Sequence, residues 1–356
     1  MFYKHNDNYT VESVTQGHPD KVCDQISDAI LDACLREDPM SRVAVESFGG
    51  HGKLYIGGEV TTLAKVDYRK IAADVYTVIG YVEPLEIELN IVTQSPEIAQ
   101  GVDTGGAGDQ GIMYGYATNE TPEYLPKGVV LAHALAKKLE EVRKNGDVSW
   151  LLPDGKTQVT FSNGQIRAVL VSTQHAPEIS QEEIRAVIIE KVIAPVIKDV
   201  DLSKIDIFVN PTGMFVQGGF EADTGLTGRK IMVDTYGGLI PHGGGCFSGK
   251  DSTKVDRSAA YMARFAAKNI VAAGLAKECL VSVAYAIGMV EPLMVEAIDE
   301  NGNDLAEVVR KNFDFRPKAI IERLDLRRPI FQQTAAYGHF GKANLPWEEI
   351  LTSLNK

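Results

Sequence analysis

The sequence predicts a mixed α/β fold of the α+β type, with sheets and helices distributed over 356 residues. Three observations predict it. Short β-like runs recur in pairs around glycine-rich or Asn-Gly turns, which is the pattern of β-hairpins. Stretches with helical spacing of apolar residues alternate with these hairpins. The composition, 44% hydrophobic and 24% charged, is that of a globular chain of roughly two to three domains.

The clearest strands form two hairpins. Residues 42–48 and 53–60 flank a Gly-Gly-His-Gly turn, and residues 157–161 and 166–172 flank Asn163-Gly164. Asn-Gly favours the tight turns whose twist matches that of paired strands. Further strands are expected at 205–209, 231–236, 280–287 and 293–298.

Three helices are expected, over residues 21–36, 181–197 and 252–273, because each segment repeats apolar side chains at helical spacing. Pro195 should disturb the second helix near its end, since proline lacks the amide that a helix interior needs. Gly274 is expected to terminate the third helix as the residue after its C-terminal cap.

Two glycine-rich stretches, at 101–111 and 218–228, divide the chain into thirds. We therefore expect an N-terminal domain over 1–104, a central domain over 105–220 and a C-terminal domain over 221–356, with discontinuous structural domains allowed. The thirds share the order hairpin then helix, but their sequences are too dissimilar to establish a repeat.

Charge and cysteine usage narrow the function classes. A net charge of −12 disfavours non-specific binding of nucleic acid, so a small anionic substrate needs a local basic patch. The four cysteines form no C-x-x-C pair, which leaves a zinc site unsupported and suits a reducing compartment. The N-terminus has no apolar signal segment, and the longest clean apolar run, 280–290, is too short to span a membrane. We therefore expect a cytoplasmic protein.

Residues 225–258 stand apart as a candidate polyphosphate site. They hold eight of the 33 glycines and five basic residues against three acidic ones. Backbone amides of the glycine triplet at 243–245 can converge on an anion, and a helix starting near Ser252 would direct its positive end there. A flexible glycine loop with solvated lysines is the alternative, and for any single lysine it is the better one. For the combination, we favour the polyphosphate site.

A second hypothesis is a phosphotransferase or ATPase of the P-loop type. Residues 244–251 fit G-x-x-x-x-G-K, but Asp251 stands where magnesium binding needs Ser or Thr. Pro241 and several glycines also separate this segment from any strand. The glycine cluster at 105–111 is either a hinge beneath an active-site lid or an interdomain linker, and spacing alone leaves both open.

The Gly-His-Pro-Asp-Lys segment at 17–21 opens the first helix. Proline suits the first helical position, and Asp20 complements the helix dipole, whereas His18 and Lys21 have no such structural explanation. Asp20 and Asp256 are candidate magnesium ligands, because Mg²⁺ binds through one or two carboxylates plus phosphates. Glu46 lies on the first hairpin, where spacing alone also fits a solvated strand residue.

Six motifs carry a resemblance to the S-adenosylmethionine synthetase family, over about residues 11–347. They are the segments 17–21, 106–111, 114–120, 225–230, 243–251 and 335–341. The resemblance implies that methionine sulfur attacks ribose C5′ of ATP, and that the released triphosphate is hydrolysed to pyrophosphate and phosphate. It also implies three similar domains around a pseudo-threefold axis. The active site would then lie between the subunits of a dimer or a dimer of dimers.

The resemblance also implies a role for each matching residue. Catalytic residues would be His18, Lys156, Asp223, Arg229 and Lys250. ATP would contact His18, Asp154, Lys156, Met214, Phe215, Asp223, Arg229, Lys230, Cys246 and Lys250. L-Methionine would contact Glu59, Gln94, Asp223 and Lys254. The cofactors would be Mg²⁺ on Asp20 and Asp256 and K⁺ on Glu46. The flexible gate would comprise Gln94, Gln100, Gly101, Val102, Asp103, Thr104 and Gly105.

Two departures from the family pattern concern the substrates. The gate between Gln100 and Gly108 is several residues short, and Met214 stands where an arginine is frequent. Cys246 replaces a common alanine, a small-for-small change. A third hypothesis is an inactive, nucleotide-binding relative. The intact set of His18, Asp20, Lys250, Lys254 and Asp256 argues against it.

Overall fold

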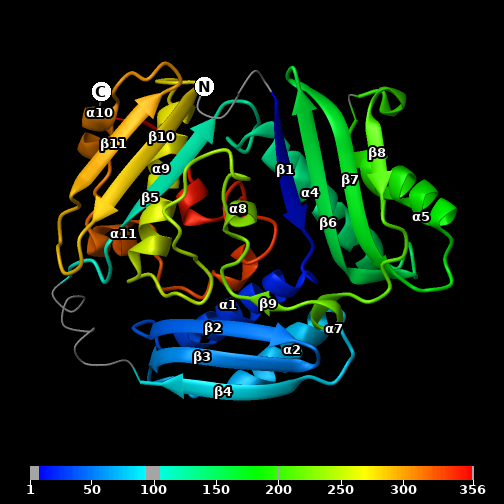
Figure 1. The fold of residues 1–356 in the computed structure, drawn as a ribbon. Helices are drawn as coiled ribbons and strands as arrows, with labels where there is room; N and C mark the ends of the chain where they lie inside the picture. The colour runs from blue at the N-terminus through cyan, green and yellow to red at the C-terminus, as the bar shows by residue number, and fades with distance from the viewer. Residues whose placement is uncertain (1–7, 94–104, 199, 355–356) are drawn as a thin grey trace.

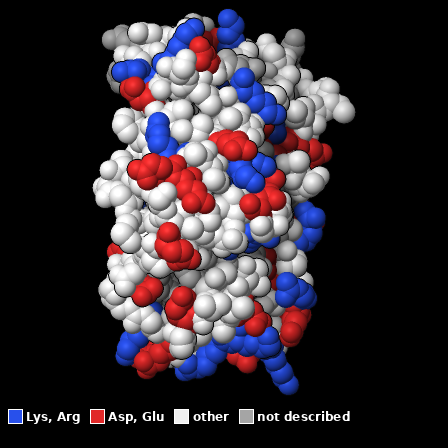
Figure 2. Space-filling model, turned by 90° about the vertical axis from the view of Figure 1, so that its right-hand side faces the viewer, with Lys and Arg blue, Asp and Glu red and all other residues white. Residues whose placement is uncertain are grey.

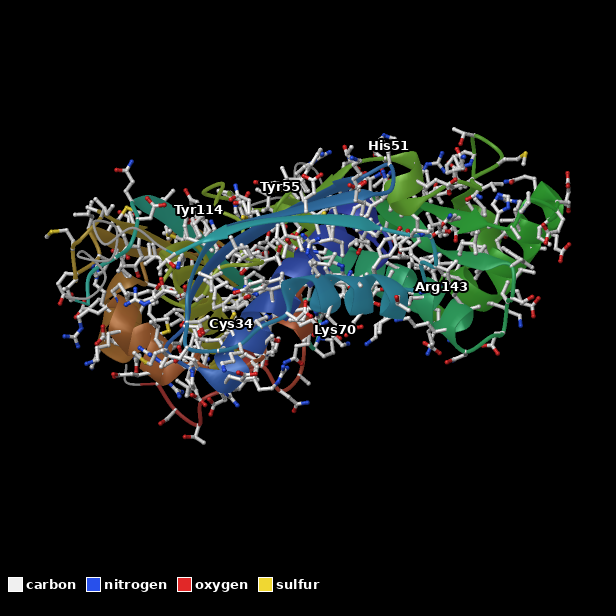
Figure 3. The ribbon with its side chains drawn as sticks, turned by 90° about the horizontal axis from the view of Figure 1, so that it is seen from below. Cys34, His51, Tyr55, Lys70, Tyr114 and Arg143 are labelled. Atoms are coloured by element: carbon white, nitrogen blue, oxygen red, sulfur yellow. The ribbon has the colours of Figure 1, made fainter. Side chains whose placement is uncertain are left out.

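A computed structural model describes residues 8–93, 105–198 and 200–354. Three sheets surround the centre of the molecule, and one long helix packs on each (Figure 1). In the view from below, the first sheet and Tyr55 lie on one side, whereas α1, α2 and Lys70 lie on the other (Figure 3). The expected mixed α/β fold, with three units around a common centre, is confirmed.

The first sheet has the order β4-β3-β2-β9. Its strands are β2 Arg42–Gly50, β3 Lys53–Thr61, β4 Glu86–Val92 and β9 Gly225–Leu226. The predicted first hairpin is therefore confirmed as β2 and β3, with β4 added in parallel and β9 antiparallel. Helix α1 (Pro19–Glu37) packs on β2, and α2 (Tyr68–Ile79) packs on α1.

The second sheet has the order β1-β6-β7-β8. Its strands are β1 Tyr9–Val14, β6 Leu151–Ser162, β7 Gln165–His175 and β8 Asp206–Val209. The predicted second hairpin is confirmed, and Asn163 and Gly164 both adopt positive φ (52° and 73°), as the tight turn requires. Helix α4 (Lys127–Lys144) packs on β6 and β1.

The helix expected over 181–197 is interrupted near its proline, as predicted. Helix α5 (Gln181–Ile188) continues into a π-helical turn, Ile189–Ile193, and then into α6 (Ala194–Val196), which contains Pro195. The wider turn accommodates the proline, which cannot donate a helical hydrogen bond. A 3₁₀ turn, Leu202–Lys204, leads into β8.

The third sheet has the order β11-β10-β5, all antiparallel. Its strands are β5 Gly111–Thr118, β10 Glu278–Tyr285 and β11 Met294–Asp299. Helix α9 (Val255–Ala272) packs closely on β5, where Gly115 lacks the Cβ that would overlap the helix backbone. The helix begins three residues later than expected, and Gly274 (φ 70°) follows its end as predicted. The chain continues through α10 Ala306–Asn312, α11 Pro317–Arg323 and 3₁₀ turns Gln332–Thr334 and Pro346–Glu348.

The strand predicted at 231–236 is wrong. The segment forms a short helix, α8 (Ile231–Asp234), which follows α7 (Gly219–Ala222) and β9. Asp234 explains the difference, because its amide donates to Lys230 O (2.8 Å) and its buried carboxylate accepts from Lys21 Nζ (2.5 Å). A buried ion pair thus overrides the local preference of an apolar run for extended structure.

Each sheet combines segments that are distant in sequence. In Figure 1 the dark blue β1 lies beside the green β6, β9 joins the first sheet, and β5 joins β10. The domain boundaries at 104/105 and 220/221 stay a prediction.

The side formed by β7, β8 and α5 carries interspersed acidic and basic side chains (Figure 2). Across the described ranges, none of the helices has the length and apolar character that a bilayer span demands.

Candidate active site

His18 caps the N-terminus of α1. Its Nδ1 accepts from the backbone N–H of Asp20 (3.2 Å), and Pro19 occupies the first helical turn as predicted. Because Nδ1 accepts, the proton of the neutral imidazole resides on Nε2. The sequence left His18 without a structural explanation, and the cap supplies one alongside any chemical role.

Asp20 lies at the centre of a group of cations. Its Oδ2 accepts from Lys230 Nζ (2.5 Å), and Arg229 Nε lies 3.4 Å from its Oδ1. The backbone N–H of Leu226 also donates to Oδ1 (3.0 Å). Asp20 is almost fully buried, whereas Arg229 is half exposed. Residues 20 and 225–230, far apart in sequence, therefore meet.

The field at this point is positive. Burial, followed by the charges of Lys230, Lys156, Lys21 and Arg229, lowers the pKa of His18 to about 2. The imidazole is therefore neutral at physiological pH. Four basic side chains act on one buried ring. Such a positive field would stabilise a bound polyanion.

Asp154 provides a buried carboxylate beside these cations. Its Oδ2 accepts from Gly219 N (2.9 Å), while Oδ1 is buried and has no hydrogen-bond partner within the described structure. Burial raises the pKa of Asp154 to about 6, against the lowering effects of the Gly219 amide, Lys156 and the Gly155 amide; the charge of Asp223 raises it further. A buried carboxylate oxygen without a donor indicates a missing polar group.

Gln174 connects Asp154 to the segment that carries Phe215. Its Oε1 accepts from Asp154 N (3.2 Å), and its Nε2 donates to Val216 O (3.0 Å). Phe215 N donates to His175 Nε2 (3.0 Å), which fixes the backbone there. Met214 is largely exposed. The structure therefore places the backbone of Phe215 near Asp154, and these residues together with Gln174 are called the Asp154 corner.

The segment 245–256 carries further predicted site residues. Lys250 Nζ donates to Asp256 Oδ2 (2.7 Å), and Gly245 lies so close that a Cβ would overlap the Asp256 carboxylate. A Cβ on Gly228 would likewise overlap the Cys246 side chain, so the two glycine-rich segments touch. The contact between the segments is made by Gly228 and Cys246, while Lys250 pairs with Asp256.

Lys254 contacts a different acid. Its Nζ donates to Asp251 Oδ2 (2.5 Å), and the same buried carboxylate accepts from Val43 N (2.6 Å). Lys254 is also the N-cap residue of α9, and Asp256 lies in the first turn of that helix. The helix dipole accounts for an acidic residue at that position.

A cavity of about 510 Å³ opens on the face of β2 and β3 opposite α1. Its lining includes three predicted site residues, Glu46, Glu59 and Lys250. Phe48, Tyr55, Asn90 and Leu226 also line it. The volume falls within the range typical of small-molecule sites. Six of the predicted gate residues, Gln94, Gln100, Gly101, Val102, Asp103 and Thr104, lie outside the described residues, and Gly105 is described.

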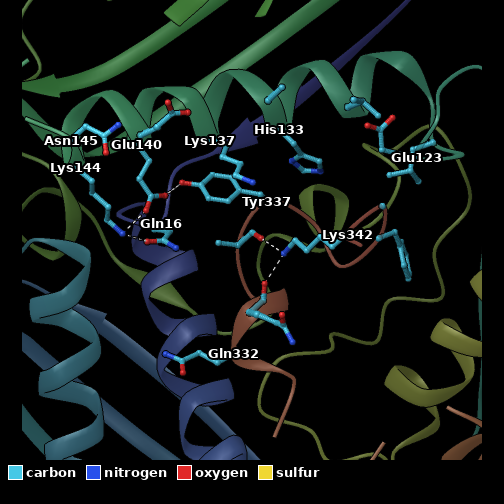
Figure 4. Close-up of a pocket in the computed structure, with 18 residues that line it drawn as sticks. Gln16, Glu123, His133, Lys137, Glu140, Lys144, Asn145, Gln332, Tyr337 and Lys342 are labelled. Carbon is cyan, nitrogen blue, oxygen red and sulfur yellow. Dashed lines mark hydrogen bonds and ion pairs between the residues drawn. The ribbon is translucent and has the colours of Figure 1, made fainter. Parts of the chain in front are cut away.

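A larger cavity, of about 630 Å³, lies between α4 and residues 332–342 (Figure 4), and none of the predicted site residues lines it. Its polar groups contact one another. Glu140 pairs with Lys144 (2.5 Å) and accepts from Tyr337, and Lys342 Nζ donates to Gln333 O (2.7 Å) and Ala336 O (2.6 Å). These internal pairs mark it as a junction between elements.

The glycine triplet bears on two of the hypotheses, that of an amide cradle for an anion and that of a P-loop. Gly244 N donates to His242 Nδ1 (2.8 Å), so this amide already has an acceptor. Residues 241–249 contain no strand, and α9 begins only at Val255, so the segment lacks the strand-loop-helix order of a P-loop. Within the described ranges, no group of three or more His, Cys, Asp or Glu side chains could hold a metal ion.

Sequence reasoning missed several buried acids behind the site. Asp24 accepts from Gly228 N (2.8 Å) and Asp28 accepts from Gly249 N (2.9 Å). Lys21 forms buried ion pairs with Asp24 (2.8 Å) and Asp234 (2.5 Å). The signal was available, because α1 carries aspartates four residues apart, which places them on one helical face. A spacing argument would have singled out that face.

Three sheet-and-helix units around a cationic, partly buried site define a mixed α/β enzyme that handles a polyanionic substrate. Family models of S-adenosylmethionine synthetase match three successive segments: the N-terminal domain at 6–102, the central domain at 104–215 and the C-terminal domain at 217–349. The chain belongs to the S-adenosylmethionine synthetase family.

Three curated relatives named S-adenosylmethionine synthase support this assignment. The protein of Mesoplasma florum is 49% identical over 366 residues, covering 96% of this chain and 97% of the relative. That of Clostridium tetani is 50% identical over 385 residues, covering 98% and 97%. That of Staphylococcus epidermidis is 49% identical over 382 residues, covering 96% and 95%. The resemblance seen in the six motifs is confirmed.

Proposed function

We propose that the residues around Asp20 and Lys250 carry the reaction of this family in this chain, a methionine adenosyltransferase that makes S-adenosylmethionine from ATP and L-methionine. One observation carries the proposal. Lys230 and Arg229 surround a single carboxylate, in the field that also lowers the pKa of His18. Basic side chains from distant segments outnumber the acids at this point, and their excess positive charge suits a triphosphate.

The chemistry needs charge neutralisation more than proton transfer. Methionine sulfur forms a bond to ribose C5′ with its own electron pair, while the C5′–O5′ bond breaks and its electrons leave with the triphosphate. A thioether has no proton to lose, so no general base is required. Lys230, Arg229 and Lys250 stabilise the departing charge, and the Nε2–H of His18 is suited to donate to O5′.

The nucleoside end of ATP is assigned to the Asp154 corner. Asp154 Oδ1 is buried without a donor, so an amino or hydroxyl group of the nucleoside would satisfy it. Phe215 is connected to this corner through Gln174 and offers a ring for the adenine face. Lys156 and Asp223 act electrostatically on Asp154, which supports their assignment to the same end.

The methionine end is assigned to the cavity on β2 and β3. The Glu59 carboxylate suits the methionine ammonium group, and Lys254 suits its carboxylate. Glu59 lines the cavity together with Lys250, which links this end to the phosphate-binding segment. Asp223 and Gln94 complete the proposed set.

The family is metal-dependent, and we assign Mg²⁺ to Asp20 and Asp256 and K⁺ to Glu46. The donor chemistry fits, because Mg²⁺ prefers one or two carboxylates plus phosphate oxygens. Gly245 also leaves room for the Asp256 carboxylate, because a side chain at position 245 would displace that carboxylate. When bound, Mg²⁺ supplies positive charge to the triphosphate oxygens. The contacts of Asp20 with Leu226 N and Lys230 hold the carboxylate in place.

After transfer, hydrolysis of the triphosphate to pyrophosphate and phosphate is assigned to the same cations. Water forms a bond to one terminal phosphorus atom and releases a proton to solvent, while the bridging P–O bond breaks and its electrons stay on the pyrophosphate oxygen. Lys250 is placed to stabilise the charge that develops on the leaving oxygen, because Asp256 positions its ammonium group (2.7 Å).

Self-association into a dimer or a dimer of dimers is part of the proposal. Phe48 and Tyr55 are more than 40% exposed beside the cavity that holds Glu59. Aromatic side chains at the rim of a site are typical of surfaces covered by a partner, and a second copy would enclose this cavity. A cytoplasmic location agrees with four free thiols.

Product analysis tests the function directly. The chain is incubated with ATP, L-methionine, Mg²⁺ and K⁺, and products are identified by mass spectrometry. S-Adenosylmethionine with pyrophosphate and phosphate is expected, and omission of methionine should abolish the sulfonium product. ADP as the main nucleotide product would instead support a phosphotransferase. ATP binding without turnover would indicate an inactive relative.

A further inference from the structure

The connection between β8 and α7 carries Phe215, and two adjacent residues at the end of β7 hold it in place. Gln174 Nε2 donates to Val216 O (3.0 Å), and its Oε1 accepts from Asp154 N (3.2 Å). His175 N donates to Phe215 O (2.9 Å), and His175 Nε2 accepts from Phe215 N (3.0 Å). Gln174 and His175 are both buried. Their hydrogen bonds are therefore largely shielded from water.

Glycines allow this connection to approach the Asp154 corner closely. A Cβ on Gly218 would lie 2.5 Å from Gln174 Cδ and 3.0 Å from Asp154 Cβ. Gly219 N donates to Asp154 Oδ2 (2.9 Å), and a Cβ on Gly219 would overlap the ring of Tyr81. The Gln174 side chain thus fills the space between Asp154 and the connection, and it contacts the backbone on both sides.

The same corner adjoins the helix terminus that carries His18. Tyr81 Oη donates to Gly17 O (2.5 Å), and a Cβ on Gly17 would overlap the backbone of Pro153. Because Gly17 and Pro153 touch, their neighbours His18 and Asp154 lie in one wall of the proposed site. All of these residues belong to a single chain, and a second copy would complete the site.

We infer that Gln174 is a positioning residue for the nucleoside end of ATP. Asp154 Oδ1 is buried and lacks a hydrogen-bond partner within the described ranges, which is where a nucleoside donor is proposed to bind. Phe215 is proposed to offer its ring to the adenine. Gln174 bonds to both segments and so sets the distance between the two groups, while it is itself assigned no contact with ATP. This role rests on the proposed function.

The experiment compares Gln174→Met with Gln181→Met. Methionine keeps most of the length of the side chain and removes both polar atoms. Gln181 begins α5, and its Nε2 also donates to a backbone carbonyl, Val209 O (2.7 Å). That acceptor lies at the end of β8 rather than on the segment that carries Phe215. The two variants therefore lose the same kind of hydrogen bond at different places.

Three constants are measured: the KM for ATP, the KM for methionine and the inhibition constant of inorganic tripolyphosphate against ATP. Tripolyphosphate has no nucleoside, so it reports on the phosphate end alone. Gln174→Met should raise the KM for ATP about tenfold, as loss of one fixed polar contact predicts. The other two constants should stay within about twofold, and Gln181→Met should keep all three near their wild-type values.

A double variant tests whether Gln174 acts through Asp154. Asp154→Asn alone should also raise the KM for ATP. Because residues that act as a unit have non-additive effects, the variant that combines Asp154→Asn with Gln174→Met should raise this KM by less than the product of the two single effects. A rise equal to the product would show that the two residues act independently and would overturn the inference.

An unchanged KM for ATP in Gln174→Met, or equal rises in all three constants, would also overturn it. If Gln174→Met does not fold, Gln174→Glu takes its place in the same comparison. Its carboxylate can still accept from Asp154 N, but it cannot donate to Val216 O. A wild-type protein that makes no S-adenosylmethionine would instead refute the proposed function.

Discussion

Lys250→Met is the sharpest perturbation of the proposed phosphate-binding segment. Lys250 Nζ donates to Asp256 Oδ2 at 2.7 Å, and both side chains are about one fifth exposed. Its backbone contacts, to Phe247 O and from Arg257, do not depend on the side chain. Methionine preserves most of the side-chain volume and removes only the charge.

The two expected costs differ in size. A partly solvated ion pair contributes about 1 kcal/mol or less to folding, so Lys250→Met should remain folded. Loss of one donor to developing charge costs about 2.7–4 kcal/mol in the barrier, which is a 10²–10³-fold fall in kcat. Activity should therefore fall far more than stability.

The assay is steady-state formation of S-adenosylmethionine, with the unfolding midpoint measured on the same preparations. Lys70→Met is the matched control, because Lys70 also forms an ion pair (with Asp74, 2.5 Å) but lies on α2, on the helix side of the molecule (Figure 3). The control should retain wild-type turnover. Near-normal turnover in Lys250→Met would remove Lys250 from the site.

Three further outcomes are expected. Glu46→Gln should reduce activation by K⁺ while leaving the Mg²⁺ titration intact, and an unchanged K⁺ titration would contradict the assignment. Burial, then Lys342, lowers the pKa of His133 from 6.5 to about 3, so the stability contributed by its neutral form is lost as pH falls from 6.5 toward 3. Relative to His133→Gln, the wild type should lose about 1.4 kcal/mol of unfolding free energy per pH unit below 6.5, and a pH-independent difference in urea denaturation would refute this. Arg264→Met should destabilise the fold by about 3–5 kcal/mol, because the backbone carbonyls of Tyr116, Glu123 and Tyr124 would lose their donor and Glu348 would be left with Lys268 as its cationic partner; a midpoint near wild type would argue against it.

Local chemistry explains which parts of the fold the sequence predicted. The hairpin around Asn163-Gly164 depends on a two-residue turn, and the end of α9 depends on Gly274, so neighbouring residues suffice. The pairing of β1 with β6 joins residues about 150 positions apart, and no local pattern encodes it. The error at 231–236 has the same origin, since Lys21 draws Asp234 into a helical turn from more than 200 residues away.

For the candidate site too, the sequence predicted what local motifs encode and not what depends on distant contacts. Motifs identified Asp20, Lys230 and Lys250 as residue types suited to phosphate and magnesium. The contact of Lys230 with Asp20 could not be read from spacing, because it depends on how α1 meets a distant loop. The aspartates at 24 and 28 were overlooked although their spacing of four is local, because a helical acidic face is usually a solvated one.

Cations from residues 225–230 and 245–256 are proposed to bind the triphosphate against Asp20. A crystal structure with the non-hydrolysable analogue adenosine 5′-(β,γ-imido)triphosphate, methionine and Mg²⁺ tests it most directly. Phosphate oxygens should lie within hydrogen-bond distance of Lys230 and Lys250. Phosphates bound instead beside Lys342, in the cavity under α4, would contradict it.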